Sequence, residues 1–180
     1  GLGNEIITIS DSSIDASFLN TLDEKTTGII NASAVTNLSG DFSALNAAYL
    51  SSNIDGLGNE IITISDSSID ASFLNTLGGH TTGVVTAIVT EGDMATLAGI
   101  TETGNALSIT VTDTSVDATA LTALDAKTTV AVDASGITTL TGTDTEQLAA
   151  YAAQRDGTIT GLDSVFDAAS YLASHSDLLR

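Results

Sequence analysis

The side chains in this chain that are best placed for chemistry are aspartates recurring at fixed intervals. They form two sets, the second lying four residues after the first: Asp11, Asp66 and Asp113, then Asp15, Asp70 and Asp117. If equivalent positions stack, each set becomes a column of carboxylates that repel one another and attract a cation such as Ca²⁺. The alternative is that the second set caps helices while the first lies in solvated turns. The sequence leaves both interpretations open.

Hydroxyl side chains on expected strands form a second candidate surface. They flank buried apolar positions and are Thr8, Ser10, Thr63, Ser65, Thr110 and Thr112. A flat row of such residues could contact ice or a polysaccharide. Ile29 with Asn31, and Ala131 with Asp133, interrupt the rows in the intervening segments. The preference of β-branched residues for strands is therefore an alternative explanation for the same pattern.

Residues typical of catalysis are scarce. The basic side chains are Lys25, Lys127, Arg155 and Arg180, and the two histidines, His80 and His175, lie far apart. His80 takes the place of Lys25 and Lys127 in the repeats described below, which predicts a solvated loop residue. Residues 56–60 are too short for a dinucleotide-binding loop, and no nucleophile or zinc motif is present. We expect no enzyme activity, no catalytic residues and no cofactor, with calcium as the one ion to consider.

An internal repeat must position all these side chains. Residues 1–22 recur letter for letter at residues 56–77, and a diverged third copy begins near Gly104. The large repeats therefore span residues 1–55, 56–103 and 104–160. Repeats of this kind bury their apolar faces only against their neighbours, which predicts an elongated array.

Each large repeat divides into coils with the pattern apolar-x-apolar-x-x-small-x-apolar. The second apolar position falls at Ile9, Ile30, Ile64, Val89, Val111 and Val132. The intervals between these positions are typical of one solenoid coil, and the longest lies between Ile30 and Ile64. The alternating triplet predicts a short strand with one buried face. We expect the six residues to stack in one buried column on adjacent parallel strands.

A helical stretch is expected after each of the first two strands. Asp15 and Asp41 are the candidate N-caps. The residues expected to face the core are Phe18, Leu19 and Leu22 in the first coil, and Leu45, Ala48 and Tyr49 in the second.

This pattern resembles the leucine-rich repeat, L-x-L-x-x-N-x-L, over roughly residues 5–140, with Ile and Val replacing Leu and with Ser, Thr or Gly replacing Asn. The resemblance implies an α/β solenoid of about six coils with parallel strands, and a parallel β-solenoid is the alternative. The segments TISDSSIDASFLNTLDEKTTG and LNAAYLSS are also similar to tandem repeats of large acidic surface or secreted proteins from cyanobacteria and other marine bacteria. That similarity implies an extracellular or cell-surface location.

Composition excludes several classes of partner. The formal net charge is −19, which disfavours nucleic acid and anionic membranes. Cysteine is absent, so disulfides and thiolate metal sites are excluded, and no apolar run is long enough for membrane insertion. Residue 1 is Gly and the chain opens within a repeat, so we expect a part of a longer protein.

The sequence therefore predicts one repeat solenoid over residues 1–160, with residues 161–180 as a helical cap or the start of a following segment. The expected function is a structural repeat module, serving as spacer, matrix element or adhesin stalk in a large extracellular bacterial protein. Its expected partners are neighbouring repeats of the same chain, with a surface or polysaccharide as the external candidate. The alternatives are a binding module that uses the Thr/Ser strand face and a calcium-binding repeat.

Overall fold

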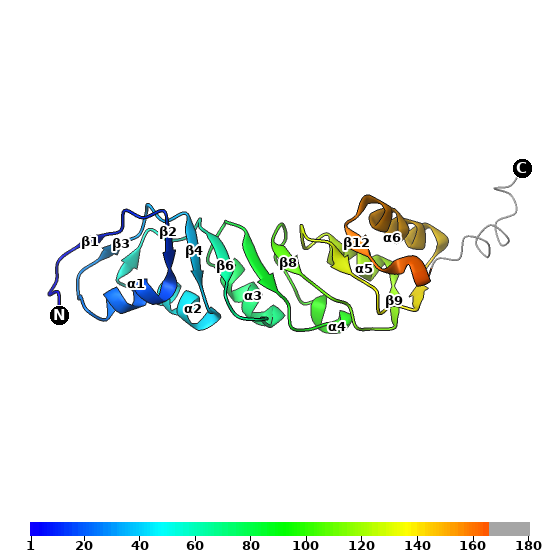
Figure 1. Ribbon diagram of the computed structural model, residues 1–180, viewed down its shortest axis with the longest axis horizontal. Coiled ribbons are helices and arrows are strands. Elements are labelled where there is room, and N and C mark those ends of the chain that lie inside the picture. The colour runs from blue at the N-terminus through cyan, green and yellow to red at the C-terminus, as the bar shows by residue number, and fades with distance from the viewer. Residues whose placement is uncertain (166–180) are drawn as a thin grey trace, which may run out of the picture.

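The computed structural model describes residues 1–165. Within them the protein is mixed α/β, and every strand pairing is parallel, which confirms the predicted class and strand direction. Figure 1 shows an elongated molecule whose elements follow one another along the long axis. Residues 166–180, with His175 and most of the predicted cap, lie outside the described residues. At the start of that cap, residues Leu162–Ser164 form one 3₁₀ turn.

The strands of residues 1–165 form four sheets. The largest has the order β2-β4-β6-β7-β8, with bounds Ser13–Asp15, Asn37–Gly40, Ile61–Ile64, Val85–Ile88 and Ala106–Ser108. The second has the order β1-β3-β5, with bounds Ile7–Thr8, Ile30–Asn31 and Ile54–Asp55. Two pairs complete the set: β9 with β11, at Ser115–Asp117 and Thr139–Thr141, and β10 with β12, at Val132–Asp133 and Ile159–Thr160.

Six short helices alternate with these strands: α1 Ala16–Asp23, α2 Phe42–Leu50, α3 Ala71–Gly78, α4 Met94–Leu97, α5 Ala118–Asp125 and α6 Asp144–Asp156. The predicted caps are confirmed. The carboxylate of Asp15 accepts a hydrogen bond from the Ser17 N–H at 2.8 Å, and that of Asp41 accepts one from the Ala44 N–H at 2.7 Å. Each bond satisfies a helical N–H that lacks an intrahelical partner.

The strand register shows how the chain advances. Ile14 pairs with Leu38 and Leu38 pairs with Ile62, so the chain makes two turns of equal length between the first and the last of these residues. In the same sheet Thr86 pairs with Ala106, which closes a shorter turn. Paired strands lie about 4.8 Å apart, so each such turn moves the chain forward by one strand spacing.

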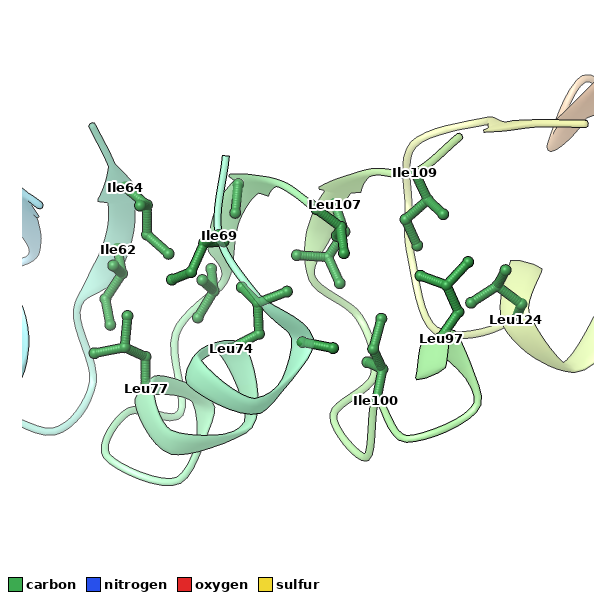
Figure 2. Close-up of a cluster of buried hydrophobic side chains, with 14 of the residues drawn as sticks. Ile62, Ile64, Ile69, Leu74, Leu77, Leu97, Ile100, Leu107, Ile109 and Leu124 are labelled. Carbon is green, nitrogen blue, oxygen red and sulfur yellow. The ribbon is translucent and has the colours of Figure 1, made fainter. Parts of the chain in front are cut away.

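The core is a continuous apolar layer between the strands and the helices. Strand residues such as Ile62 and Leu107 face Leu74, Leu77 and Leu97, which the helices contribute (Figure 2). Ile62 and Leu77 are completely buried. Each turn of the chain therefore covers the apolar row of its neighbours, as in other stacked repeats.

The predicted single column of strand residues is wrong, although all six residues are buried. Ile30 pairs with Ile7 in the β1-β3-β5 sheet, whereas Ile64 lies opposite Gly40 in the five-stranded sheet. The physical reason is that the first three turns each carry two short strands, which distribute these positions between two sheets. The long interval between Ile30 and Ile64 also contains β5, which sequence analysis missed.

The inward prediction for Phe18 is also wrong. Leu19 is fully buried, but Phe18 is 54% exposed, because neighbouring helical residues point about 100° apart. In the second copy of the repeat, the equivalent Phe73 stacks on Phe42 of the preceding turn, with ring centroids 4.2 Å apart. The flank that carries Phe73 is thus a place where two turns meet, whereas the same flank at Phe18 has no preceding turn against it.

Candidate functional site

The candidate strand-face residues are all exposed, but they do not form one surface. Thr8 lies in β1 and Thr63 in β6, which belong to different sheets, while Thr110 forms an isolated bridge with Asp133. Ser10, Ser65 and Thr112 are exposed after the strands or bridge that precede them.

The two sheets differ in what lies beside the threonines. Thr8 is in register with Asn31, as the sequence predicts for an interrupted row. Thr63 is in register with Ser39 on one side and Thr86 on the other, so three hydroxyl residues follow one another across the five-stranded sheet. This sheet offers the longest regular hydroxyl surface among residues 1–165.

The first set of aspartates caps helices of the preceding turn. Asp66 accepts a hydrogen bond from the Phe42 N–H of α2 at 2.7 Å, and Asp113 accepts one from the Met94 N–H of α4 at 2.6 Å. Asp66 is exposed at a bend after β6, as the turn interpretation predicted, but these bonds give Asp66 and Asp113 a capping role that was not predicted for the first set. Asp11, at the equivalent place in the first copy, makes no hydrogen bond within residues 1–165.

The second set of aspartates occupies N-cap positions, as one of the two interpretations predicted. Asp117 accepts a hydrogen bond from the Ala120 N–H at 3.1 Å, whereas Asp70 makes no side-chain capping bond. Glu91 of the following turn substitutes for it, accepting from the Ala71 N–H at 3.0 Å. Carboxylates at helix N-termini are also stabilised by the helix dipole.

The calcium interpretation requires carboxylates that converge on one point. Within residues 1–165, no group of three or more His, Cys, Asp or Glu side chains is arranged to hold a metal ion. Asp15, Asp66, Asp113 and Asp117 each bind an N–H group at the start of a different helix, which separates these four carboxylates from one another.

A shallow cavity of about 380 Å³ lies beside these caps, between α2 and α3. The stacked rings of Phe42 and Phe73 form part of its wall, together with Asp41, Asp66 and Asp70. Two of the three carboxylates already bind helical N–H groups, so this cavity is mainly the surface of a junction between two turns.

A buried polar cluster joins the same two turns. Glu60 is completely buried and accepts hydrogen bonds from the Tyr49 hydroxyl at 2.8 Å and the Gly58 N–H at 2.8 Å. Burial, together with the bond to Glu60 and its charge, raises the pKa of Tyr49 far above its ordinary value. The Tyr49 ring also stacks on His80, with centroids 5.2 Å apart. His80 thus lies in a turn, as predicted, but it is only partly exposed because its ring packs against the preceding turn.

Sequence analysis missed a set of threonines that connect the turns. Thr81 is buried, donates to the Glu60 carbonyl at 2.7 Å and accepts from the Gly83 N–H at 2.9 Å. Thr128 makes the equivalent link, donating to the Leu107 carbonyl at 2.7 Å. The signal was present as the recurring TTG at residues 26–28 and 81–83 and TTV at residues 128–130.

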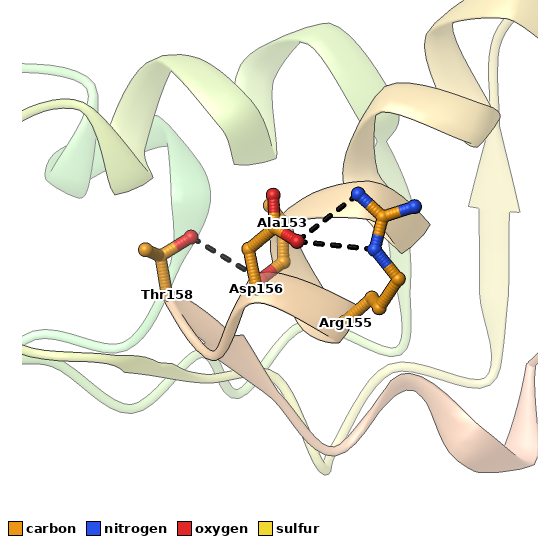
Figure 3. A network of polar contacts seen from close by, with 4 residues as sticks. All are labelled: Ala153, Arg155, Asp156 and Thr158. Atoms are coloured by element: carbon orange, nitrogen blue, oxygen red, sulfur yellow. Dashed lines mark hydrogen bonds and ion pairs between the residues drawn. The ribbon is translucent and has the colours of Figure 1, made fainter.

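The basic side chain of Arg155 does not join the acidic residues described above. It forms an ion pair with its neighbour Asp156 at 3.0 Å, at the end of α6, where both side chains are largely exposed (Figure 3). Exposed pairs of this kind contribute little to stability. The pair supplies no concave site in which an acid and a base could act together.

No helix among residues 1–165 combines the length and apolar character needed to cross a bilayer. No protein-family model, curated protein or solved structure matches the chain.

Proposed function

We propose that this protein is a leucine-rich-repeat-like solenoid of about six coils that serves as a structural repeat module. The module acts as a spacer, matrix element or adhesin stalk within a large extracellular bacterial surface protein. The observation that carries this proposal is the recurrence of the same contacts between successive turns along the molecule.

Two kinds of contact recur. The buried Thr26 and Thr81 and the partly buried Thr128 donate hydrogen bonds to carbonyl groups of the preceding turn. Carboxylates bind the first helical N–H of the preceding turn, through Asp66, Glu91 and Asp113. Contacts of this kind connect nearest neighbours only, so a copied unit can extend the array without changing any existing junction.

The acidic composition supports the extracellular part of the proposal. A net charge of −19 keeps separate molecules apart and suits a salty medium that screens self-repulsion. The proposal includes no enzyme activity, because four of the six recurring aspartates, Asp15, Asp66, Asp113 and Asp117, bind the N–H groups of four different helices rather than lining a shared cleft.

Small-angle X-ray scattering on lengthened chains tests the spacer function. Three copies of residues 1–55, inserted between Asp55 and Gly56, supply three identical units. Each unit should add about two strand spacings, roughly 10 Å, so the maximum dimension should grow by about 30 Å at a constant cross-section. Insertion of a shuffled sequence of the same composition is the control. The proposal is contradicted if the cross-section of the lengthened chain increases. It is also contradicted if its maximum dimension does not follow the expected growth more closely than that of the control.

A second candidate function is polymer binding by the outward face of the five-stranded sheet. The row Ser39–Thr63–Thr86, bordered by the exposed Ile61 and Ile88, favours it. Substituting Thr63 by Lys should abolish retention on an immobilised polysaccharide, whereas the same change at the isolated Thr8 should not. Equal retention of the wild type, Thr63→Lys and Thr8→Lys contradicts this second candidate.

A further inference from the structure

The exact repeat places one sequence in two environments within the same molecule. Residues 56–77 lie between two turns, whereas residues 1–22 have a neighbour on one side only. Ile61 is 45% exposed but its equivalent Ile6 is 73% exposed. Glu60 is completely buried, while Glu5 is exposed. Because the local sequence is identical, the neighbouring turn causes these differences.

The groups that cover the second copy come from residues 36–49. The Ile61 N–H donates to the Thr36 carbonyl at 2.9 Å, and the Ser65 N–H donates to the Gly40 carbonyl at 2.9 Å. The helical N–H of Phe42 is bound by Asp66, as described above. The sheet edge, the helix cap and the aromatic stack therefore all depend on one preceding turn.

The first copy presents the same groups without these partners. Ile6 and Ser10 carry the amides equivalent to those of Ile61 and Ser65, and neither amide donates a hydrogen bond within residues 1–165. The carboxylate of Asp11 likewise makes no hydrogen bond there. An open strand edge with unused donors and an unused capping acceptor is a template for another strand and helix.

We propose that residues 5–11, with Phe18 beside them, are the docking site for a further unit with the sequence of residues 1–55. The inference rests on the solenoid architecture in the proposed function. The turn of the added unit equivalent to residues 36–49 covers the edge. Asp11 binds the first N–H of its second helix, Glu5 accepts from its tyrosine hydroxyl, and Phe18 stacks on its phenylalanine.

The occupant is a linked unit rather than a separate second copy. In the chain itself, residues 36–49 already cover residues 60–66, so a free copy cannot offer them. The matching residues 138–151 of the third repeat carry Asp144 in the place of Phe42, so they offer no ring to stack on Phe18. A linked unit also docks head to tail and leaves an identical open edge at its own start. Contacts of this heterologous type can repeat without closing on themselves.

Asp11 provides the test, because its contribution to stability should depend on the added unit. The change Asp11→Ala is made in the present chain and in a chain with one further copy of residues 1–55 ahead of Gly1. In the second chain, the altered Asp11 is the one that follows the added unit. Asp66→Ala in the present chain is the matched control, since Asp66 already caps α2.

Loss of a capping acceptor should raise the equilibrium constant for unfolding roughly three- to thirty-fold for Asp66→Ala. We expect Asp11→Ala to change it less than twofold in the present chain and as much as Asp66→Ala in the extended chain. If Asp11→Ala leaves the equilibrium constant for unfolding of the extended chain unchanged, the docking proposal is overturned. The spacer function is tested separately, because scattering can still show that the extended molecule is longer. A concentration-dependent effect in the present chain would place a second copy on the edge and would equally overturn it.

Discussion

Ile7 and Ile62 form a natural pair for measuring what one neighbouring turn contributes. They occupy the same place in the two identical segments, residues 1–22 and 56–77. Ile62 pairs with Leu38 and Val85 and is completely buried, whereas Ile7 pairs only with Ile30 and is partly buried. The changes Ile62→Ala and Ile7→Ala therefore remove the same atoms from two different surroundings.

The magnitude follows from the atoms removed. Each substitution deletes three carbon atoms, worth about 2.4 kcal/mol of transfer free energy at ~0.8 kcal/mol each when fully buried. At Ile62 the substitution also leaves a cavity between two turns, so we expect the free energy of unfolding to fall by about 2–5 kcal/mol. At Ile7 roughly half the transfer free energy applies and water can enter the space, so we expect a loss of about 1 kcal/mol.

Urea denaturation followed by circular dichroism measures both losses. The slope m must stay unchanged for the two midpoints to be compared as free energies of unfolding, since a linear array can lose cooperativity. Losses within about 0.5 kcal/mol of each other, or a larger loss at Ile7, would refute the claim that a preceding turn covers Ile62 but not Ile7.

Three further changes test the junctions and caps. A Cβ at Gly83 would lie 2.0 Å from the Glu60 carbonyl oxygen, so Gly83→Ala should lower the melting temperature, whereas Gly79→Ala, with ordinary contacts at 3.5 Å, should not. Hydrogen bonds from the backbone N–H and hydroxyl of Thr96 lower the pKa of Asp93 below its ordinary 3.8, so its contribution is present at neutral pH and lost in acid. The stability difference between the wild type and Asp93→Ala should therefore narrow as the pH falls below about 4, and a difference that stays constant on acidification would contradict this. Millimolar calcium should raise the melting temperature no more than magnesium at equal ionic strength, and a selective shift would indicate a calcium site.

Much of the local structure was predictable because it depends on local signals. The aspartates at positions 15 and 41 predicted the helix starts, and the caps confirm them. The alternating triplets predicted one strand per coil, and five of the six overlap a strand, namely β1, β3, β6, β7 and β10, while the triplet around Thr110 forms only an isolated bridge. The parallel direction follows from repetition, since equivalent segments stack in the same orientation. These features need only the residues of a single turn.

The errors concern contacts between turns. The pattern around Ile54 is too short to predict β5, which exists because β3 provides a partner strand. The contacts of Asp66 and His80 were not predicted because their partners, Phe42 and Tyr49, belong to the preceding turn and lie far from them in the sequence. Such contacts depend on the length of chain between two paired strands, and that length differs from one pair to the next within the five-stranded sheet.

The candidate site was predictable only in part. Asp15, Asp70 and Asp117 lie at helix starts, as one interpretation predicted, but the choice between cation binding and capping needed the positions of the helix N-termini. The buried threonines, such as Thr81, were overlooked because a hydroxyl between two polar neighbours gives no sign of burial. Their repetition at positions 26, 81 and 128 was the available signal.

Amide exchange measured by NMR on the whole chain tests the central claim most directly, namely that each turn pairs in parallel with its neighbours. Mass spectrometry cannot distinguish the two copies, because residues 1–22 and 56–77 are identical and give peptides of identical mass. Segmental isotope labelling of residues 1–55 or 56–180 instead assigns each NMR signal to one copy. The amides of Ile61 and Ser65 should be protected, since each donates to the preceding turn, whereas those of Ile6 and Ser10 should exchange freely. The amide of Ile7, which donates to the Ile29 carbonyl, should be protected and serves as the internal control. Equal exchange at Ile6 and Ile61, and at Ser10 and Ser65, would contradict the account.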